Sequence, residues 1–390
     1  MRPPATVFSQ ITAGLYTLEF ARCAEQFPMP RTSRSFSAYD HFLALCFGQL
    51  TYRDSLRDIV TCLNARPRLQ FHLGFRGHIT RTNLAYANEH RDWRVFEAVA
   101  QVLMRRAQRL YHDESGDEDL PRVAFALDSS IIHLSLNLFP WAYYPRSKAA
   151  ALKLHTLLLI RGSLPVWSTL TEATFPDMKM LDEIPVQPGA FYVMDRGYLD
   201  FGRLLRLQQQ KAFFVVRSKC HVRFRVLQSR KVDKTCGLRC DQTIGLTTSW
   251  SRKSYDLPLR RIRFRDEVHL HSLVFLTNNF DLGPQVICQL YKRRWEVELF
   301  FKWIKQHLRI RNFFGRSPNA IRCQVWTAIC SYLLVAIARK QLGLEKSLHE
   351  ILQILSVTAF EQTPLNEVLA HDPLSSSTPN HHEAQVSLGF

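Results

Sequence analysis

Four short apolar runs between residues 123 and 216 limit the possible folds of this chain more than any other feature. They are residues 123–127, 157–160, 190–194 and 213–216. Runs of this length without alternation are typical of strands that are buried on both faces of a sheet. Two of the runs end directly at an aspartate, Asp128 and Asp195. Since sites in open α/β sheets form beyond the carboxyl ends of strands, both aspartates are candidate site residues.

The segment before these strands has a helical pattern. Apolar residues recur at intervals of three and four between residues 38 and 110, and a short helix capped by Thr80 or Thr82 would carry Arg81 and Asn83 at its start. Arg and Asn at a helix start are suited to reading bases in a DNA groove. The alternative is an ordinary surface helix in a small bundle.

Residues 217–270 differ from the core runs because apolar and basic residues alternate. Segments 222–226 and 261–265 predict strands with one charged face, which could follow phosphates or be solvated. A core strand returns at 273–277. A long helix is predicted from about 285 to 309, followed by an apolar helix over 322–340.

The apolar run at 325–338 is too short for a membrane span, which needs ~20 apolar residues. It also contains Thr327 and Ser331, so it predicts a buried helix, and we expect a cytoplasmic, nucleoid-associated protein without a membrane partner. With 51 Lys and Arg against 34 Asp and Glu, the net charge of +17 favours a polyanionic partner such as DNA or RNA.

The predicted helix at 285–309 places four polar residues on one stripe. At 100° per residue, Tyr291, Arg294, Glu298 and Lys305 fall within a narrow arc. The neighbouring arc is apolar and consists of Leu290, Val297, Phe300, Phe301, Ile304 and Leu308. The pattern therefore predicts a carboxylate at the edge of a buried helix face, among groups that suit phosphates.

Asp128, Asp195 and Glu298 together form a candidate metal site. Mg²⁺ prefers hard oxygen ligands, and three carboxylates can hold two Mg²⁺ or Mn²⁺ ions ~4 Å apart for phosphoryl transfer. Arg294 and Lys305 would then stabilise charge on the phosphate. Taken singly, an Asp after a strand is more often a turn former, and a Glu beside Lys on a helix is more often a surface ion pair.

Three motifs in this chain resemble one family. Tyr291, Arg294, Glu298 and Lys305 match in spacing the YREK signature of bacterial insertion-sequence transposases, and residues 195–198 and 127–130 are similar to the two aspartate blocks of that group. The resemblance covers roughly residues 120–345. It implies an α/β fold, in which an RNase H-like mixed sheet flanked by helices is interrupted by a β-strand insertion and preceded by a helical N-terminal domain.

The resemblance also assigns roles. Asp128, Asp195 and Glu298 would be the metal-binding catalytic triad, and Tyr291, Arg294 and Lys305 would contact DNA phosphates near the transposon end. The family excises its element through a DNA hairpin with a flipped base, which needs an aromatic platform. Trp295 matches an aromatic at this place in relatives. Trp250 is a weaker candidate, for which plain packing is the favoured alternative.

The expected organisation has six parts. They are a helical DNA-binding region at 1–112, an acidic linker at 113–121, the first part of the catalytic core at 122–216, a β-rich insertion at 217–270, the second part of the core at 271–345, and a C-terminal helix with a disordered tail at 346–390.

The expected function is a transposase that binds the inverted-repeat ends of its element, cleaves them and joins them to target DNA, working as a homodimer. The alternatives are a metal-dependent nuclease without transposition and a basic DNA-binding protein without catalysis. The nine cysteines favour free thiols. Cys220, His221, Cys236 and Cys240 could form a zinc site, but scattered structural thiols are the favoured interpretation.

Overall fold

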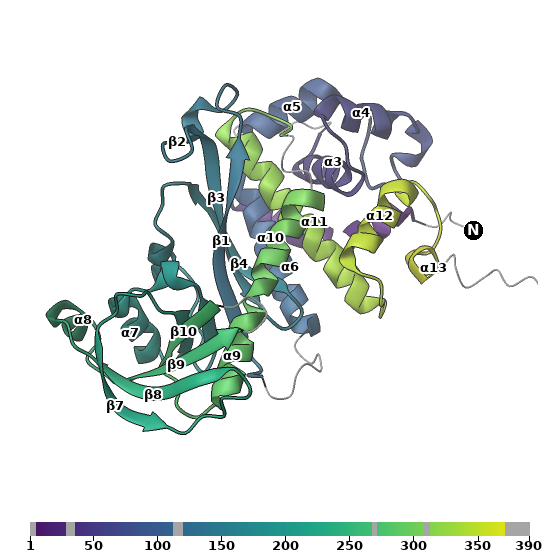
Figure 1. The fold of residues 1–390 in the computed structure, drawn as a ribbon. Helices are drawn as coiled ribbons and strands as arrows, with labels where there is room; N and C mark the ends of the chain where they lie inside the picture. The colour runs from purple at the N-terminus through teal and green to yellow at the C-terminus, as the bar shows by residue number, and fades with distance from the viewer. Residues whose placement is uncertain (1–4, 29–35, 112–119, 267–270, 308–312, 371–390) are drawn as a thin grey trace, which may run out of the picture.

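The computed structural model describes residues 5–28, 36–111, 120–266, 271–307 and 313–370. A ten-stranded mixed sheet has the order β2-β3-β1-β5-β6-β10-β9-β8-β7, with β4 beside β3 (Figure 1). The strands are β1 Ala124–Leu134, β2 Tyr143–Tyr144, β3 Ala149–Leu159, β4 Leu164–Glu172, β5 Phe191–Met194, β6 Phe213–Arg217, β7 Phe224–Arg230, β8 Leu238–Leu246, β9 Leu259–Asp266 and β10 His271–Thr277.

All four apolar runs form strands of the central part of this sheet. β1 pairs in parallel with β5, and β5 in parallel with β6, while β3 is antiparallel to β1. Alternate residues of β1 enter two separate cores: Ala124 and Ala126 face one, and Phe125 and Leu127 face the other. Helices cover both faces, so the structure confirms the expected RNase H-like mixed α/β fold.

β1 differs from the sequence prediction in its length. The apolar run ends before Asp128, but the strand continues to Leu134 because residues 128–134 keep their pairing with β3. The pairing with β5 does end at Leu127. Asp128 therefore lies inside a strand, at the point where β1 leaves its parallel neighbour. The prediction that the strand ends at Asp128 was wrong.

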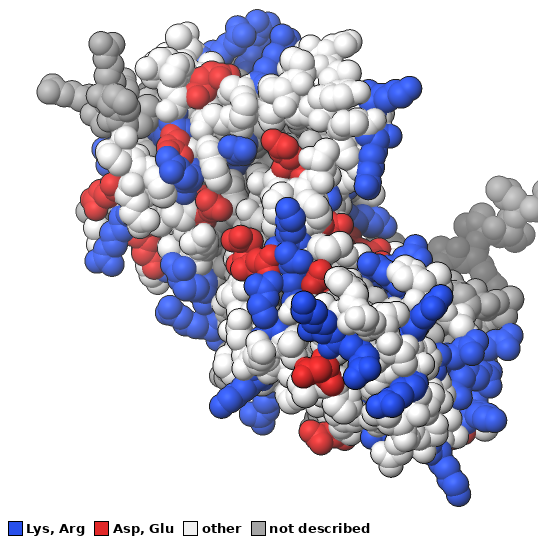
Figure 2. All heavy atoms as spheres, turned by 90° about the vertical axis from the view of Figure 1, so that its left-hand side faces the viewer, with Lys and Arg blue, Asp and Glu red and all other residues white. Residues whose placement is uncertain are grey.

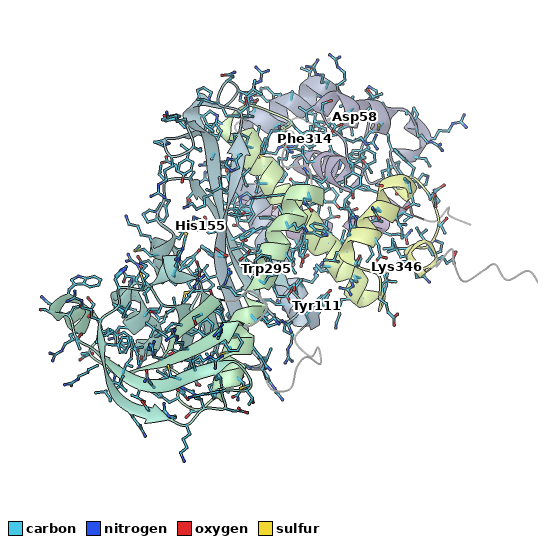
Figure 3. All side chains as sticks on the ribbon, in the orientation of Figure 1. Asp58, Tyr111, His155, Trp295, Phe314 and Lys346 are labelled. Carbon is cyan, nitrogen blue, oxygen red and sulfur yellow. The ribbon has the colours of Figure 1, made fainter. Side chains whose placement is uncertain are left out.

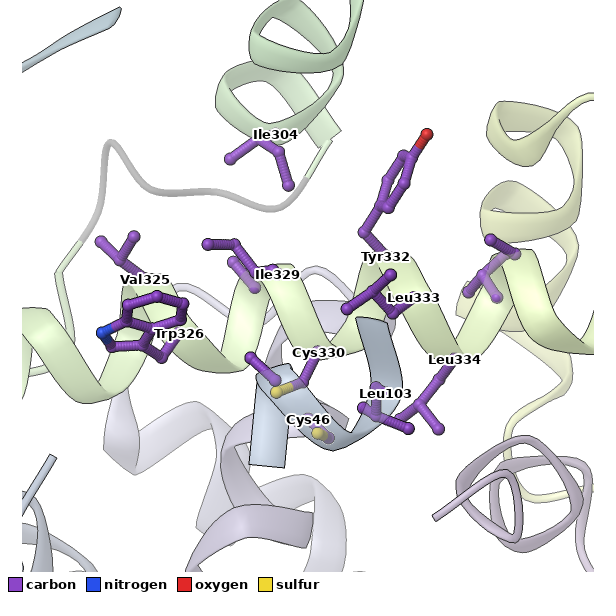
Figure 4. Close-up of a cluster of buried hydrophobic side chains, with 14 of the residues drawn as sticks. Cys46, Leu103, Ile304, Val325, Trp326, Ile329, Cys330, Tyr332, Leu333 and Leu334 are labelled. Atoms are coloured by element: carbon purple, nitrogen blue, oxygen red, sulfur yellow. The ribbon is translucent and has the colours of Figure 1, made fainter. Parts of the chain in front are cut away.

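The helical part packs around one long apolar helix. The helices before the sheet are α1 Val7–Thr12, α2 Thr17–Glu25, α3 Ala38–Leu50, α4 Leu56–Asn64, η1 Pro67–Leu69, α5 Arg81–His90 and α6 Arg94–Tyr111. α3, α5 and α6 contact α11 Pro318–Gln341, as do α12 Leu348–Thr358 and α10 Trp295–His307. Figure 4 shows Cys46 and Leu103 from the N-terminal helices beside Cys330 and Leu334 of α11.

The predicted apolar helix at 322–340 is confirmed as part of α11. This helix is long and apolar enough to cross a membrane by length and composition, and 94% of its most apolar window is buried inside the protein. Ile329, Leu333 and Ile337 have no exposed surface. Its hydrophobicity is therefore used in the core, where it joins the N-terminal helices to the sheet through α6 and α10.

The segment 217–270 extends the sheet, because β9 pairs with β10 and β10 pairs with β6. The predicted strands at 222–226 and 261–265 correspond to β7 and β9. β8 was not predicted, since its sequence includes Asp241 and Gly245. Asp241 occupies a buried position there because Arg260 of β9 donates to both of its carboxylate oxygens, at 2.9 and 2.8 Å.

The remaining helices include η2 Pro140–Ala142, η3 Asp177–Asp182, η4 Arg196–Tyr198, α7 Phe201–Gln209, α8 Ser249–Ser254, α9 Pro284–Arg293 and α13 Leu365–Ala370. The single helix predicted at 285–309 is two helices, α9 and α10, which meet at Arg294. There the backbone N–H of Arg294 donates to Tyr291 and that of Val297 to Arg294, in place of i to i−4 bonds.

Some expectations fall on residues outside those that the structure describes. The linker at 113–119, the tail from 371 and the end of the predicted helix at 308–309 belong to this group. The division of the chain into six parts stays a prediction.

Candidate catalytic site

Asp128 and Asp195 lie side by side in the middle of the sheet, where the parallel pairing of β1 and β5 ends. Leu127 of β1 is the register partner of Met194 of β5, so the next residues along the two parallel strands are Asp128 and Asp195. Buried apolar residues immediately before each aspartate fix the strands, while both aspartates are partly exposed. The two aspartates are therefore neighbours, although β1 continues past Asp128 to Leu134.

The α9–α10 segment brings three polar residues to the aspartates. The Tyr291 hydroxyl donates to Asp195 Oδ1 at 3.0 Å. Arg294 Nη1 donates to Asp128 Oδ2 at 2.7 Å, and its Nη2 donates to Glu298 Oε1 at 2.6 Å. α10 packs on β1 and β3 through its apolar face, including Val297, and the polar stripe that borders this face brings Glu298 to the side of the aspartates through Arg294.

The guanidinium of Arg294 bridges Asp128 and Glu298, and its side chain is largely buried between them. Burial alone would lower the pKa of Arg294, but the charge of Asp128, together with the charge and hydrogen bond of Glu298, outweighs this effect and raises it. The bridge therefore neutralises two carboxylates with a cation that stays charged at any physiological pH. The sequence prediction placed Arg294 on DNA phosphate, whereas here it lies on carboxylates.

The pKa of the Asp128 carboxyl is shifted by its surroundings. Burial raises its pKa to about 6, against the lowering effects of the Arg294 charge and of the Ser129 backbone N–H. That N–H donates to Asp128 Oδ1 at 2.8 Å, so the two oxygens of Asp128 are held by different groups. A carboxylate whose charge is poorly solvated gains free energy from a nearby cation.

Arg217 is a site residue that the sequence reasoning missed. Its Nη1 lies 3.8 Å from Asp195 Oδ1, because Arg217 follows Val216, the register partner of Met194. The signal was available: Arg217 comes directly after the fourth apolar run, as Asp128 and Asp195 come after the first and third. A cation in this position is the residue that would compensate the two aspartates beside it.

The other candidates lie at the edge of the site or away from it. Trp295 is 56% exposed at the start of α10, next to Arg294 (Figure 3). Lys305 is half-buried, three turns after Arg294. Trp250 is 66% exposed on α8 in the insertion, away from a core position.

Arg81 and Asn83 occupy the first turn of α5, as predicted. Thr80 is the N-cap, since its hydroxyl accepts from the Asn83 backbone N–H at 3.1 Å. The structure does not bring either residue to the carboxylates, because α5 packs on α3, α4 and α11. In Figure 1, α5 lies near β2, whereas α10 runs down beside β1 toward α9.

The donor set of Asp128, Asp195 and Glu298 fits a divalent cation. All the side chains are hard oxygen donors, as Mg²⁺ and Mn²⁺ prefer, and Arg294 compensates charge that a cation could compensate instead. In the described parts of the chain, no group of three or more His, Cys, Asp or Glu is arranged to hold an ion without movement. Cys236 and Cys240 are not part of such a group, and Cys240 accepts from Arg261 at 3.0 Å.

The surface around this site is mixed in charge. Figure 2 shows Lys and Arg side chains spread over both lobes of the molecule, with acidic side chains between the lobes and also scattered over each lobe. Exposed Arg225, Arg263 and Arg265 lie on β7 and β9 of the insertion. The molecule therefore has basic groups on either side of its acidic site, an arrangement suited to a polyanion that must reach the carboxylates.

Two family models match this chain. One is described as a transposase DDE domain and covers residues 119–334. The other, a domain of unknown function (DUF4372), covers residues 4–76. The first model includes Asp128, Asp195 and Glu298, and it spans more than half of the chain.

Similar proteins are also named as transposases. One from Sinorhizobium fredii is 28% identical over 308 residues, covering 78% of this chain and 83% of its own. One from Geobacillus stearothermophilus, named for insertion sequence element IS5377, is 29% identical over 217 residues, covering 55% of this chain and 56% of its own. Among solved structures, a piggyBac transposase synaptic complex with hairpin DNA matches with a TM-score of 0.43 and 10% identity, over 97% of this chain and 85% of that one.

Proposed function

The chain belongs to the family of transposases with a DDE domain, enzymes that cleave DNA and transfer its strands, and from this premise we propose that Asp128, Asp195 and Glu298 are its catalytic triad. The observation that supports the proposal is the register of β1 and β5, which makes the two aspartates neighbours, together with the Arg294 bridge from Asp128 to Glu298. The spacing of Tyr291, Arg294, Glu298 and Lys305 further supports membership of the YREK subgroup.

Asp128, Asp195 and Glu298 would hold two Mg²⁺ or Mn²⁺ ions. When bound, such ions activate a water or a 3′-hydroxyl and stabilise the leaving oxygen of the phosphodiester. The raised pKa of Asp128 agrees with this role, since burial leaves its charge in need of a cation. Asp195 and Glu298 face Tyr291 and Arg294, respectively.

In this proposal Arg294 binds first the carboxylates and then a DNA phosphate. Without metal it neutralises Asp128 and Glu298; with the carboxylates otherwise compensated, its planar donors are free to bind a phosphate near the transposon end. Tyr291 and Lys305 would contact neighbouring phosphates. Trp295 has an exposed aromatic face beside Arg294, which suits stacking on a flipped base during a hairpin reaction. Arg81 and Asn83 would contact the same DNA away from the site.

The substrate in this proposal is the pair of inverted-repeat ends of an insertion sequence, and the second substrate is target DNA. Two ends must be brought together, so the working form is a homodimer. The net charge of +17 supports tight but salt-dependent binding to DNA. We place the protein in the cytoplasm, at the nucleoid, where its substrate lies.

The test is cleavage of a plasmid that carries the flanking ends of the gene, with Mg²⁺ or Mn²⁺, by wild type and by Asp195→Asn. We expect metal-dependent cutting at the element ends by wild type and none by the variant. Binding of the ends without cutting by either protein would reject the catalytic proposal in favour of a DNA-binding protein. Cutting without transfer of a pre-cut end to target DNA would identify a nuclease.

A further inference from the structure

A further acidic residue, Asp177, is connected to Asp128 by hydrogen bonds through Ser129. Asp177 begins η3, after β4, and its Oδ1 accepts from the Ser129 hydroxyl at 2.8 Å. The backbone N–H of the same Ser129 donates to Asp128 Oδ1 at 2.8 Å. One residue, Ser129, therefore connects the Asp177 carboxylate to the Asp128 carboxylate through two hydrogen bonds.

Asp177 is itself held by a buried cation. Lys153 of β3, which is 8% exposed, donates through Nζ to Asp177 Oδ1 at 3.1 Å and to the Phe175 carbonyl at 2.8 Å. His155 lies two residues further along β3, with Nδ1 3.9 Å from the same oxygen. A carboxylate with a buried Lys partner on a central strand is fixed in place, since neither group can move without leaving a buried charge uncompensated.

The other carboxylate oxygen of Asp177 lies near the turn that follows Asp195. Asp177 Oδ2 is 4.0 Å from the position that a Cβ on Gly197 would occupy, in the turn that follows Asp195. η3 and η4 also lie close to one another. Asp177 therefore lies between the strand that carries Asp128 and the turn that begins at Asp195.

We propose that Asp177 is a positioning residue, which sets the orientation of Asp128 through Ser129 and so prepares the carboxylate pair for a divalent cation. The inference rests on the proposed function of Asp128 and Asp195. Asp177 acts through Ser129 and not by contact with the reacting atoms. Groups that orient metal ligands by hydrogen bonds are worth 10- to 100-fold in metal affinity.

The same short helix offers a matched control. Asp182 ends η3 and is also a partly exposed carboxylate with cationic partners, because Arg203 and Arg206 both pair with it. Asp182 has no hydrogen bond to Ser129. A loss that comes from weakening η3 in general would appear in Asp182→Asn as well as in Asp177→Asn.

The experiment measures Mn²⁺ affinity of the full chain by electron paramagnetic resonance, with no DNA present. Ser129→Ala breaks the link to Asp177 while keeping the Lys153–Asp177 pair and the backbone N–H, so it avoids an uncompensated buried charge. We expect a Kd about 10- to 100-fold weaker for Ser129→Ala and Asp177→Asn, recovery of most of the affinity in Ser129→Thr, and wild-type affinity in Asp182→Asn.

Unchanged Mn²⁺ affinity in Ser129→Ala, beside a wild type that binds Mn²⁺ and an Asp195→Asn variant that does not, would overturn this inference alone. An equal loss in Asp182→Asn would also overturn it. A wild type that does not bind Mn²⁺ would overturn both this inference and the proposed function.

Discussion

Near the ends of the strands β3, β1, β5 and β6, two arginines pair with carboxylates, whereas on β7 and β9 several arginines point to solvent. Arg294 and Arg217 lie on the acids of the candidate site. Arg225 and Arg263 are exposed. The same residue type therefore lies in two settings. In the core half it compensates the acids that we propose as metal ligands, and in the insertion it provides exposed positive charge that we propose for DNA binding.

Other arginines of the insertion pair with an acid. Arg260 and Asp241 are both buried and pair with each other, and Arg260 also donates to the Leu282 carbonyl at 2.6 Å. This pair lies in the interior of the insertion, away from the candidate site. We attribute to it a structural role, in contrast with the Arg294 bridge, which lies at a partly exposed site where a ligand can enter.

The largest effect should come from Glu298, one of two glutamates in the first turn of α10. Glu298→Gln should lower DNA cleavage by about a hundredfold to a thousandfold or more, because it removes a charged metal ligand. Glu296→Gln is the control, since Glu296 accepts from Ser163 at 2.7 Å and lies outside the bridge. Cleavage rates at saturating DNA would check this. Equal losses in both variants would mean that α10 contributes only structure.

The buried pair of the insertion predicts a stability effect. Asp241→Asn leaves the Arg260 charge without its partner, so we expect the free energy of unfolding to fall by about 3–5 kcal/mol. Asp58→Asn serves as the control, because its ion pair with Arg53 is partly exposed and should contribute about 0–1 kcal/mol. Urea denaturation measures both. A loss below 1 kcal/mol for Asp241→Asn would contradict the structural role of the pair.

His155 should make the stability of the core half more sensitive to acid than that of the insertion. Burial, with a smaller contribution from Lys153 and against the opposing charge of Asp177, lowers the pKa of His155 to about 4. The unfolded chain binds a proton below about pH 6.5, where the folded His155 stays neutral. The neutral His155 therefore makes its full contribution to the free energy of unfolding above pH 6.5. Up to about 3 kcal/mol of that free energy is lost as the pH falls to 4.

Urea denaturation at pH 7 and pH 4.5 tests this, with His155→Gln expected to lose part of the difference. His221→Gln, at an exposed position in the insertion, should keep it. An identical pH dependence in wild type and His155→Gln would reject the assignment.

The smallest effect concerns the exposed arginines of the insertion. Arg263→Ala or Arg265→Ala should each reduce the slope of log binding constant against log salt by about 1, since each removes one phosphate contact. The cleavage rate at saturating DNA should not change. Fluorescence anisotropy over a salt series measures the slope. Unchanged slopes in both variants would make the charged face of β9 a solvated surface.

The sequence predicted the core half of the sheet better than the insertion. Unbroken apolar runs identified the strands of the core half, and the aspartates that follow two of them, because burial on both faces leaves a strong pattern. β8 was not predicted, because a buried Asp241 breaks the apolar pattern of a strand. Its charge is compensated by Arg260, which lies nineteen residues later in the chain. Arg294 was expected on DNA, since sequence could not show that it reaches Asp128, 166 residues earlier.

The most direct test of the account is to locate Mn²⁺ by anomalous diffraction in crystals of the protein. We predict ions bound among Asp128, Asp195 and Glu298, with the Arg294 guanidinium moved away from Asp128 and Glu298. Ions bound elsewhere, with the Arg294 bridge intact at saturating Mn²⁺, would contradict the assignment of these carboxylates as the catalytic site.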